Sequence, residues 1–388
     1  MKCLLVSPDF PPPFEGGSLV YIYNLIEFYP GRVDVFTAKL QVNLKEIDMK
    51  HKIIRSRFLT GSFNPTKLQL LVMYVYMPFW ILFANLFSRY DIIITSAGLV
   101  GNCITAIVSK LLRVPAVGVG YAEELIIPMK RKGLKNFIKR TLMEYSYNKF
   151  NGFIACCHFT KGTANTLGIP EDKIEVFPVM LNDRKGMEIA NEKIKNINKK
   201  HQILTVGRLV ERKGFHFLIE AVKLLKDEIP DVELYIVGRG AEEKRLENLI
   251  KRYKLEKNVF LTGVLSEDEL SELYKKSAVF VLANVTLPNG DTEGCPTVFI
   301  EASAHGIPVI GGINCGASDA VDDGATGYLV NPRDIETLKE KIKELLLNPE
   351  LAEKMGEMGR IKVRNGHSSQ KAGQRLEHFL ERIINEKR

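Results

Sequence analysis

Residues 292–312 read TEGCPTVFIEASAHGIPVIGG, a loop of small residues that leads into an apolar segment. Proline is well tolerated at the start of a helix and glycine commonly ends one, so the pattern predicts a helix from Pro296 to His305, closed by Gly306. The first backbone amides of such a helix suit a phosphate group, because Gly294 has no side chain to block the approach. This stretch therefore predicts a ligand site at the start of a helix.

The same stretch carries two carboxylates, Glu293 in the loop and Glu301 in the predicted helix, with seven residues between them. Glu301 lies little more than one helical turn beyond the amides, where it can accept hydrogen bonds from a vicinal diol. Glu293 then faces the part of the ligand that lies beyond the phosphates. The alternative is an ordinary αβ unit whose two glutamates are simply solvated.

A second element lies upstream, where an apolar run at 203–206 predicts a buried strand that leads into GRLVERKG at 207–214. It places Arg208, Arg212 and Lys213 at the carboxyl end of a strand, where open α/β sheets bind ligands. Arg208 as a planar fork and Lys213 as a point charge would neutralise a diphosphate. The alternative is a set of loop charges that only aid solubility.

Three further motifs accompany these elements: IVGRG at 236–240, GVLSEDELSELYKKSAVFVL from residue 263, and GATGYLVNP from residue 324. Together they resemble the donor-binding half of the family-4 retaining glycosyltransferases (group 1). The resemblance implies an α/β fold of the GT-B type, with two facing Rossmann-like, doubly wound domains and a cleft between them. It implies an acceptor-binding domain at 1–182 rejoined by the C-terminal helix 370–388, a linker at 183–200, and a donor-binding domain at 201–369.

The resemblance also assigns roles to residues. In that family the second glutamate holds the nucleotide ribose, the first touches the donor sugar, and the arginine and lysine hold the diphosphate. The implied catalytic residues are Arg208, Lys213 and Glu293. The implied residues of the nucleotide-sugar site are Gly16, Gly17, Gly207, Gly238, Gly294, Cys295, Pro296, Thr297 and Glu301.

The N-terminal half departs from the family at one informative place. Many members carry a histidine after the strand predicted at PAVGVG, residues 115–120, near the transferred sugar, and this chain has Tyr121 instead. A tyrosine still donates and accepts hydrogen bonds, but it is not a group that charges easily near neutral pH. Glu123 and Glu124 follow it and would orient an acceptor; the alternative is a pair of exposed loop acids.

The composition and charge of the chain limit the kinds of partner that it is expected to bind. The 388 residues carry a net charge of +8, with no zinc-finger, basic-zipper or RNA-motif signature, so an anionic membrane is a better partner than nucleic acid. The segment MKRKGLKNFIKRTL from Met129 mixes basic and apolar residues as an interfacial helix does, or else forms a solvated basic face. The run 70–84 has no charged residue but Pro78 interrupts it, which favours a buried or interface-lying helix over a membrane span.

The sequence therefore predicts a metal-independent hexosyltransferase that uses a UDP-sugar or GDP-mannose and a glycan or lipid-linked acceptor, in cell-envelope glycan biosynthesis. No Asp-x-Asp pair occurs, so protein cations replace a metal ion, and no cofactor is expected beyond the nucleotide sugar. The six cysteines lack a C-x-x-C pair, which favours reduced thiols in a cytoplasmic protein. A peripheral position on the cytoplasmic membrane face stays open, as do a nucleotide-sugar epimerase and a non-catalytic sugar-nucleotide-binding protein.

Overall fold

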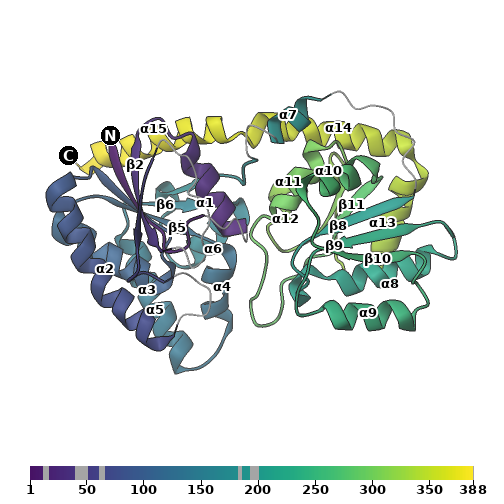
Figure 1. The fold of residues 1–388 in the computed structure, drawn as a ribbon, viewed down its shortest axis with the longest axis horizontal. Coiled ribbons are helices and arrows are strands. Elements are labelled where there is room, and N and C mark those ends of the chain that lie inside the picture. Colours follow the sequence, from purple (N-terminus) through teal and green to yellow (C-terminus); the bar gives the residue numbers. More distant parts are fainter. Residues whose placement is uncertain (12–16, 40–50, 61–65, 182–185, 193–200, 388) are drawn as a thin grey trace. The chain divides into compact units, whose positions relative to one another are not determined.

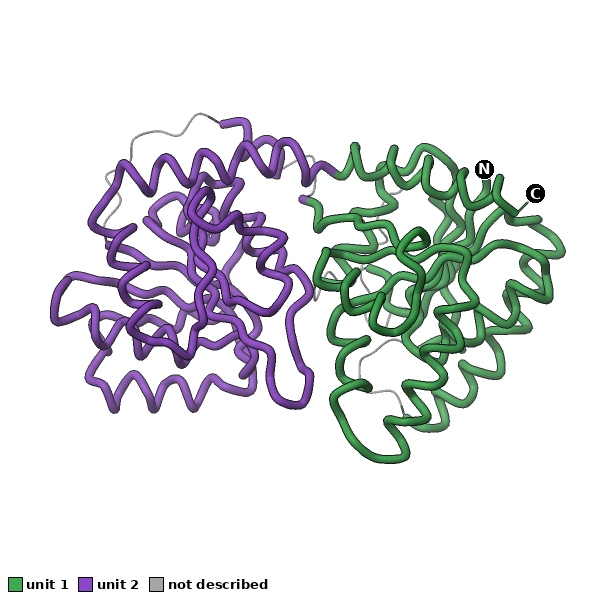
Figure 2. The backbone as a smooth tube through the Cα atoms, turned by 180° about the vertical axis from the view of Figure 1, so that it is seen from behind, with its two compact units in different colours: residues 1–180, 369–388 green, residues 181–368 purple. Residues whose placement is uncertain are grey.

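The computed structural model describes residues 1–11, 17–39, 51–60, 66–181, 186–192 and 201–387. The chain divides into two compact units (Figure 2): unit 1 is residues 1–180 with 369–388, and unit 2 is residues 181–368. Gly16 and most of the predicted linker lie outside the described residues.

The described part of unit 1 contains a parallel sheet of seven strands in the order β3-β2-β1-β4-β5-β6-β7. Most of the strands are buried apolar runs, as parallel strands covered on both faces must be, whereas the edge strand β3 is only partly buried. Their bounds are β1 Lys2–Val6, β2 Arg32–Ala38, β3 Lys52–Ser56, β4 Ile92–Thr95, β5 Ala116–Gly120, β6 Gly152–Ala155 and β7 Ile174–Val176. The strand order reverses between β1 and β4, which pair in register from Cys3 with Ile92.

The helices of unit 1 cover this sheet (Figure 1). They are α1 Gly17–Glu27, α2 Lys67–Ser88, α3 Gly98–Leu112, α4 Ala122–Lys130, α5 Leu134–Lys149, α6 His158–Thr166 and the C-terminal α15 Ser369–Lys387. Helix α15 packs against α1, and a side chain on Gly152 in β6 would collide with Ile383 of α15 at 2.4 Å. The last helix of the chain is therefore an integral layer of unit 1.

Helix α2 differs from the sequence-based expectation. Thr66 and Gln69 form a capping box at its start, and the helix runs through Pro78 to Ser88, so the expectation of an interruption at that proline is wrong. Only Met73, Met77 and Ile81 are buried, and they anchor the helix to the core on both sides of the proline. Among the described helices, α2 alone has the length and apolar composition to cross a membrane. The outer face of α2 is exposed, so the prediction of a buried helix is wrong for that face.

The described part of unit 2 contains a second parallel sheet, in the order β10-β9-β8-β11-β12-β13. Its strands are β8 Gln202–Val206, β9 Glu233–Val237, β10 Val259–Gly263, β11 Val279–Leu282, β12 Val309–Gly312 and β13 Gly327–Val330. Its helices are α7 Gly186–Asn191, α8 Phe215–Leu225, α9 Glu243–Arg252, α10 Glu267–Lys276, α11 Thr297–Ala304, α12 Ala317–Ala320, α13 Ile335–Leu347 and α14 Pro349–Gly366.

The predicted linker contains structure that its composition does not indicate. Residues 186–191 form α7, which packs against α11 and α14 and therefore belongs to unit 2. The cause is Arg360, a buried arginine on α14 whose guanidinium donates to the carbonyl oxygens of Ile189, Ala190 and Glu192. One planar fork thus satisfies the last carbonyls of a short helix, which otherwise lack partners.

Two doubly wound parallel sheets with helices around them confirm the predicted α/β fold of two Rossmann-like units. The cleft that the resemblance implies between the units stays a prediction.

Candidate functional site

In unit 2 the strand order reverses between β8 and β11, which are neighbours in the sheet. Open parallel sheets bind ligands outside the carboxyl ends of their strands at such a point. The GRLVERKG loop follows β8, and the loop that carries Glu293 follows β11. The two elements that the sequence singles out, some 80 residues apart in the chain, therefore meet where the topology favours a ligand.

Glu293 is the centre of an ion cluster at this position. Its Oε1 accepts a hydrogen bond from Nε of Arg212 at 2.6 Å, and its Oε2 lies 3.2 Å from Nζ of Lys213. Asp291 approaches the other side of the Arg212 guanidinium at 3.4 Å. The side chains of Arg212, Lys213 and Glu293 are only 11–12% exposed. Both cations and the glutamate are therefore held in fixed geometry and largely shielded from water.

The electrostatics of Glu293 follow from this geometry. Burial by itself raises the pKa of a carboxyl group, but the charges and hydrogen bonds of Lys213 and Arg212 outweigh it and hold the pKa of Glu293 below its ordinary value. Glu293 is thus an anion throughout the physiological pH range. A carboxylate bound by two cations is a poor general acid because it holds no proton, but it provides a well-oriented negative charge.

The turn that presents the cations is fixed by the backbone. Glu211–Lys213 form a 3₁₀ turn, and the amide of Val285 donates to the carbonyl oxygen of Arg212 at 2.8 Å, which ties the loop after β8 to the loop after β11. Gly214 ends the turn with φ +68°, and a Cβ there would lie 1.8 Å from the carbonyl oxygen of Ala283. Only glycine fits this conformation and this close approach.

Gly207 and Gly238, predicted as donor-binding residues, lie side by side after β8 and β9. A Cβ on Gly238 would lie 2.1 Å from the carbonyl oxygen of Gly207, and Gly238 has φ +135°. Their first role is therefore to let two backbone segments touch at the rim of the site. A Cβ on Gly207 would lie 3.5 Å from the Lys213 side chain, an ordinary van der Waals contact, so Gly207 and Lys213 are neighbours at this rim.

Helix α11 begins beside this cluster. Pro296 is its N-cap, and the helix runs from Thr297 to Ala304, one residue inside each end of the predicted span. Within the described part of the chain, no acceptor takes the backbone N–H of Thr297 or Val298, so these donors are available to an anion. The preceding Gly294 packs with its carbonyl against Gly316, and Cys295 is buried.

Glu301 lies one turn further along α11. The hydroxyl of Tyr274, a buried residue of α10, donates to Oε2 of Glu301 at 3.2 Å. Desolvation raises the pKa of Glu301, and hydrogen bonds from Tyr274 and Thr297 partly offset it. Tyr274 also stacks on His305, with ring centroids 4.6 Å apart. The carboxylate that the resemblance assigns to a ribose diol is thus oriented by a tyrosine that sequence reasoning did not single out.

The structure does not bring every predicted catalytic residue into the cluster. Arg208 is exposed and outside it, because the chain turns sharply there, with the amide of Val210 bonded to the Arg208 carbonyl oxygen at 2.8 Å. Arg212 occupies the position next to Glu293 instead. The sequence contained a signal for this residue, since it lies beside Lys213 in the same motif, but nothing in the motif distinguishes which arginine points inward.

Unit 1 has a pocket at its own point of strand reversal, with a volume of about 200 Å³. It is lined from the chain after β1, by Ser7 and Asp9, from the chain after β4, by Ser96, and from the chain after β5, by Tyr121 and Glu124. The topology of unit 1 therefore places the predicted acceptor-side residues Tyr121 and Glu124 in one pocket, whose lining is partly polar and partly apolar.

Tyr121 is a hydrogen-bond junction in this pocket. Its hydroxyl lies 3.3 Å from the hydroxyl of Ser96 and donates to the carbonyl oxygen of Ser18 at 3.2 Å, and its ring meets Tyr21 edge to face. Desolvation raises the pKa of Tyr121 far above its ordinary value, so it is neutral at any physiological pH. Tyr121 thus links the chain after β4 to the start of α1, where Gly17 is the first helical residue.

Glu123 and Glu124 form the first turn of α4. Desolvation, with the carboxylates of Glu123 and Asp9 as further causes, raises the pKa of Glu124 to about 7. Solvent still reaches the Glu124 side chain, so the two neighbouring negative charges are the firmer cause of the rise. The pKa of Glu124 therefore lies above the ordinary value of a glutamate.

Two Rossmann-like units, each with a polar site where its strand order reverses, define the two-domain GT-B class. Residues 187–362 match the family model described as "Glycosyl transferases group 1", and residues 15–184 match "Glycosyltransferase Family 4". The two models together match most of the chain. The chain belongs to the family-4, group 1 glycosyltransferases.

Individual proteins agree with this assignment. A GDP-mannose-dependent alpha-(1-6)-phosphatidylinositol monomannoside mannosyltransferase from Mycolicibacterium smegmatis is 33% identical over 46% of this chain and 47% of its own. Sucrose-phosphate synthase from Thermosynechococcus elongatus has a similar fold, with a TM-score of 0.78 at 20% identity over 99% of both chains. Anabaena HepE, solved with UDP, has a TM-score of 0.74 at 18% identity over 98% of this chain and 100% of its own. The chain spans about half the length of the curated relatives it matches.

Proposed function

We propose that the protein is a retaining glycosyltransferase that moves a hexosyl group from a UDP-sugar or GDP-mannose to a glycan or lipid-linked acceptor without a metal ion. The observation that carries this proposal is the buried cluster of Arg212, Glu293 and Lys213 where the strand order of unit 2 reverses. A cluster of this kind offers fixed positive charge and one fixed negative charge at the place where the fold favours a nucleotide.

The donor would bind along the start of α11. The free amides of Thr297 and Val298, together with Lys213, are placed to receive a diphosphate, and Glu301 would accept hydrogen bonds from the ribose hydroxyls. Arg208 adds a solvent-exposed cation outside the ion cluster. The base stays open between uracil and guanine: one relative is named for GDP-mannose and one structural neighbour was solved with UDP.

Catalysis would rest on charge stabilisation. When the bond between sugar and diphosphate breaks, negative charge develops on the leaving phosphate and positive charge at the anomeric carbon. The negative charge on the leaving phosphate would be stabilised by Lys213, Arg208 and the α11 amides. Removing one such donor costs on the order of a hundredfold in rate. The positive charge at the anomeric carbon would be stabilised by Glu293, which Lys213 and Arg212 keep ionised. These protein cations would do the work of a metal ion.

Retention of configuration is what the family resemblance implies, and the contacts of Glu293 bear on which of the two retaining mechanisms applies. A double displacement needs a carboxylate free to attack the anomeric carbon, whereas both oxygens of Glu293 already bind cations. Attack by the acceptor on the face that the diphosphate leaves, with the leaving phosphate taking the acceptor proton, needs no such nucleophile.

The acceptor would bind in the unit 1 pocket beside Tyr121 and Glu124. A lipid-linked acceptor is favoured by the surface of unit 1, which presents apolar side chains outward from two helices. On α2 these are Leu68, Leu71, Val72, Val75, Phe79, Phe83, Leu86 and Phe87, and on α5 they are Leu134, Phe137, Ile138, Leu142 and Tyr145. Both sets follow helical spacing, so each forms a stripe on the outer face of its helix.

Lysines 130, 132, 135 and 139 and arginines 131 and 140 surround the α5 stripe. An apolar stripe flanked by cations matches an anionic lipid surface, which takes apolar side chains between its headgroups and attracts lysine and arginine. We therefore propose that unit 1 docks on an anionic membrane and receives its acceptor there.

The donor assignment is tested by calorimetry of UDP and GDP binding without added metal, to the wild type and to Glu301→Ala. We expect one nucleotide to bind and the substitution to weaken it by about tenfold or more, the value of a hydrogen bond to a charged group. Failure of both nucleotides to bind would remove the donor assignment and leave only the fold.

Transfer is separated from the two competing activities by nucleotide release. A transferase releases UDP or GDP from the sugar nucleotide only when an acceptor is present, so lipid extracts of the cell envelope are added to the intact protein. An epimerase converts the sugar without releasing nucleotide, and a binding protein does neither.

A further inference from the structure

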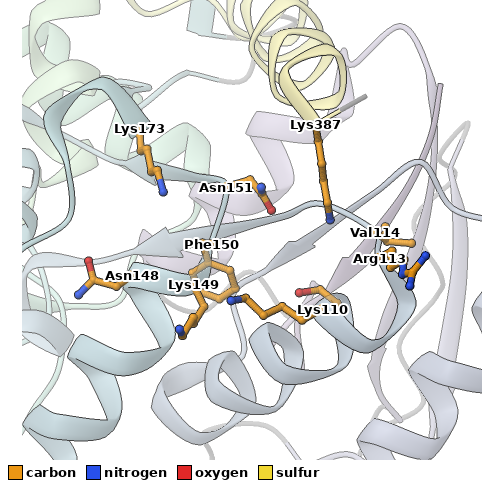
Figure 3. A pocket seen from close by; sticks show the side chains of 10 residues that line it. Lys110, Arg113, Val114, Asn148, Lys149, Phe150, Asn151, Lys173 and Lys387 are labelled. Atoms are coloured by element: carbon orange, nitrogen blue, oxygen red, sulfur yellow. The ribbon is translucent and has the colours of Figure 1, made fainter.

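A second pocket lies at the opposite edge of the unit 1 sheet from Tyr121 and Glu124. It has a volume of about 610 Å³ and is formed where α3 and α5 end and where β5, β6 and β7 begin, with the last turn of α15 beside it (Figure 3). In a parallel sheet the amino ends of the strands lie at the edge away from the carboxyl ends. This pocket is therefore separate from the predicted acceptor site.

The lining of this pocket is cationic. Its charged residues are Lys110, Arg113, Lys149, Lys173 and Lys387, and no aspartate or glutamate lines it. None of the five makes an ion pair with a carboxylate in the part of the chain that the structure describes. They come from four separate segments of the chain, so the fold gathers the charge here and no single basic run explains it.

The cations also crowd one another. Lys110 and Lys149 both line the pocket, and Figure 3 shows the Lys110 side chain extending toward the side of the pocket where Lys149 lies. Partial desolvation and the charges of Lys149 and Lys173 lower the pKa of Lys110, and desolvation and Lys110 lower that of Lys387. Like charges that share a pocket repel one another, so a bound anion would stabilise this part of unit 1.

Neutral donors complete the lining. The carboxamide oxygen of Asn151 accepts from the backbone amide of Ala116 at 3.1 Å, which orients the NH₂ group of Asn151 at the pocket. Lysine ammoniums, an arginine fork and an amide together make a site for a group with several acceptor oxygens and more than one negative charge. Phosphate is the common biological group with those properties.

We propose that this pocket binds a phosphate group, as an anion site distinct from the donor site of unit 2. It goes beyond glycosyl transfer and does not depend on it. The neighbouring surface indicates a lipid headgroup as the source: Ile107 and Leu111 of α3 are exposed one turn before and directly after Lys110, and the exposed ring of Tyr145 lies under the Lys149 ammonium. Acyl chains beside these residues would leave the headgroup phosphate at the lysines.

The phosphate arm of the test uses thermal unfolding of the intact protein in inorganic phosphate, against chloride at the same ionic strength. The pocket variant is Lys110→Gln with Lys149→Gln. The matched control is Lys251→Gln with Lys257→Gln, which removes the same charge from exposed positions of unit 2. We expect phosphate to raise the melting temperature of the wild type and the control more than that of the pocket variant, because a ligand stabilises only the state that binds it.

In chloride the pocket variant is expected to be at least as stable as the wild type, because the substitutions relieve repulsion. The lipid arm measures flotation of the same three proteins with phosphatidylcholine vesicles and with mixed phosphatidylcholine–phosphatidylglycerol vesicles. Loss of about tenfold in affinity for the mixed vesicles by the pocket variant, but not by the control, identifies a lipid headgroup.

A lost phosphate response with unchanged vesicle binding supports the site and identifies a soluble phosphate as its source. Equal phosphate responses and equal vesicle binding in all three proteins overturn the proposal. Donor binding, measured with UDP and GDP on the pocket variant, is expected to be unchanged, so failure of the phosphate site is distinguishable from failure of the glycosyltransferase assignment.

Discussion

Nε of Arg212 lies 2.6 Å from Oε1 of Glu293, although 81 positions separate the two residues in the chain. This contact joins the loops after β8 and β11 and fixes the direction in which the glutamate points. It makes Arg212 the residue that positions Glu293, a role that the sequence motif alone assigns to none of its cations.

Arg212→Ala is expected to lower kcat by on the order of a hundredfold, because it releases one oxygen of Glu293 and removes a fixed positive charge. The free energy of unfolding should fall by roughly 1.5–3 kcal/mol, the range for a hydrogen bond to a charged group. Denaturant unfolding and steady-state kinetics measure the two effects. Arg208→Ala is the matched control: because Arg208 is exposed, its stability should change by no more than about 0.5 kcal/mol. Equal destabilisation by both substitutions would contradict the assigned role of Arg212.

Tyr274→Phe is expected to weaken nucleotide binding while leaving the sugar-transfer step little changed. The substitution removes the hydroxyl that holds Glu301 at 3.2 Å but keeps the ring that stacks on His305. The lost orientation should cost about 1 kcal/mol of binding free energy, or roughly fivefold in Kd. Calorimetry with the preferred nucleotide gives the value, and an unchanged Kd would show that Glu301 does not depend on Tyr274.

Acid should weaken the protein through Glu293. The pKa of this group is lower in the folded protein than its ordinary value of 4.5, so its ion pairs contribute stability that is complete above pH 4.5 and is lost as the pH falls through the folded pKa. The melting temperature of Glu293→Gln should therefore lie below that of the wild type at pH 7, and the difference should shrink on acidification. A difference that is constant with pH would mean that the charge of Glu293 is not the cause.

The ionisation of Glu124 should change the stability of the protein with pH in the opposite direction to that of Glu293. Its pKa rises from 4.5 to about 7 on folding, so the protonated form is favoured in the folded state and stability declines as the pH rises from 4.5 to 7. Glu124→Gln mimics the protonated group and is expected to raise the melting temperature relative to the wild type at pH 8, with a smaller gain at pH 5. Glu256→Gln, at an exposed position of unit 2, should show no such pH dependence.

Phe79→Gln with Phe83→Gln is expected to reduce flotation with anionic vesicles. These side chains are 68% and 61% exposed on the outer face of α2, and burying an aromatic ring in lipid is worth roughly 1.5–3 kcal/mol. The control pair is Val264→Gln with Leu347→Gln, two exposed apolar residues of unit 2. Equal flotation of both variants with the wild type would remove the proposed docking of α2.

The sequence predicted the elements whose causes are local. The strand that ends at Val206 was expected from a short apolar run, and the helix that follows Pro296 was expected from a proline, a glycine and an apolar segment between them. Both are confirmed to within a residue, because propensity, capping and burial agree there. The two Rossmann-like units were implied by the family resemblance that the motifs carry.

What the sequence did not predict depends on contacts between distant segments. Arg208 and Arg212 are equivalent in composition, and only the 3₁₀ turn and its bond to Val285 decide which one meets Glu293. The sequence of α7 was interpreted as a linker, because Arg360, the arginine that caps this helix, lies far along the chain. Pro78 was expected to interrupt α2, but burial of residues on both sides holds the helix together.

The start and end of unit 2 are neighbours in space. The amide of Leu181 donates to the carbonyl oxygen of His367 at 3.1 Å, and Leu181 forms a bridge with Ser368. The unit is therefore a single insertion into the chain of unit 1, with both of its joints at one place. A unit built in this way can be exchanged as a cassette between related proteins, because the host has to accommodate only two adjacent crossings. Recombination at Leu181 and Ser368 would thus give new pairings of the two units, without redesign of either core.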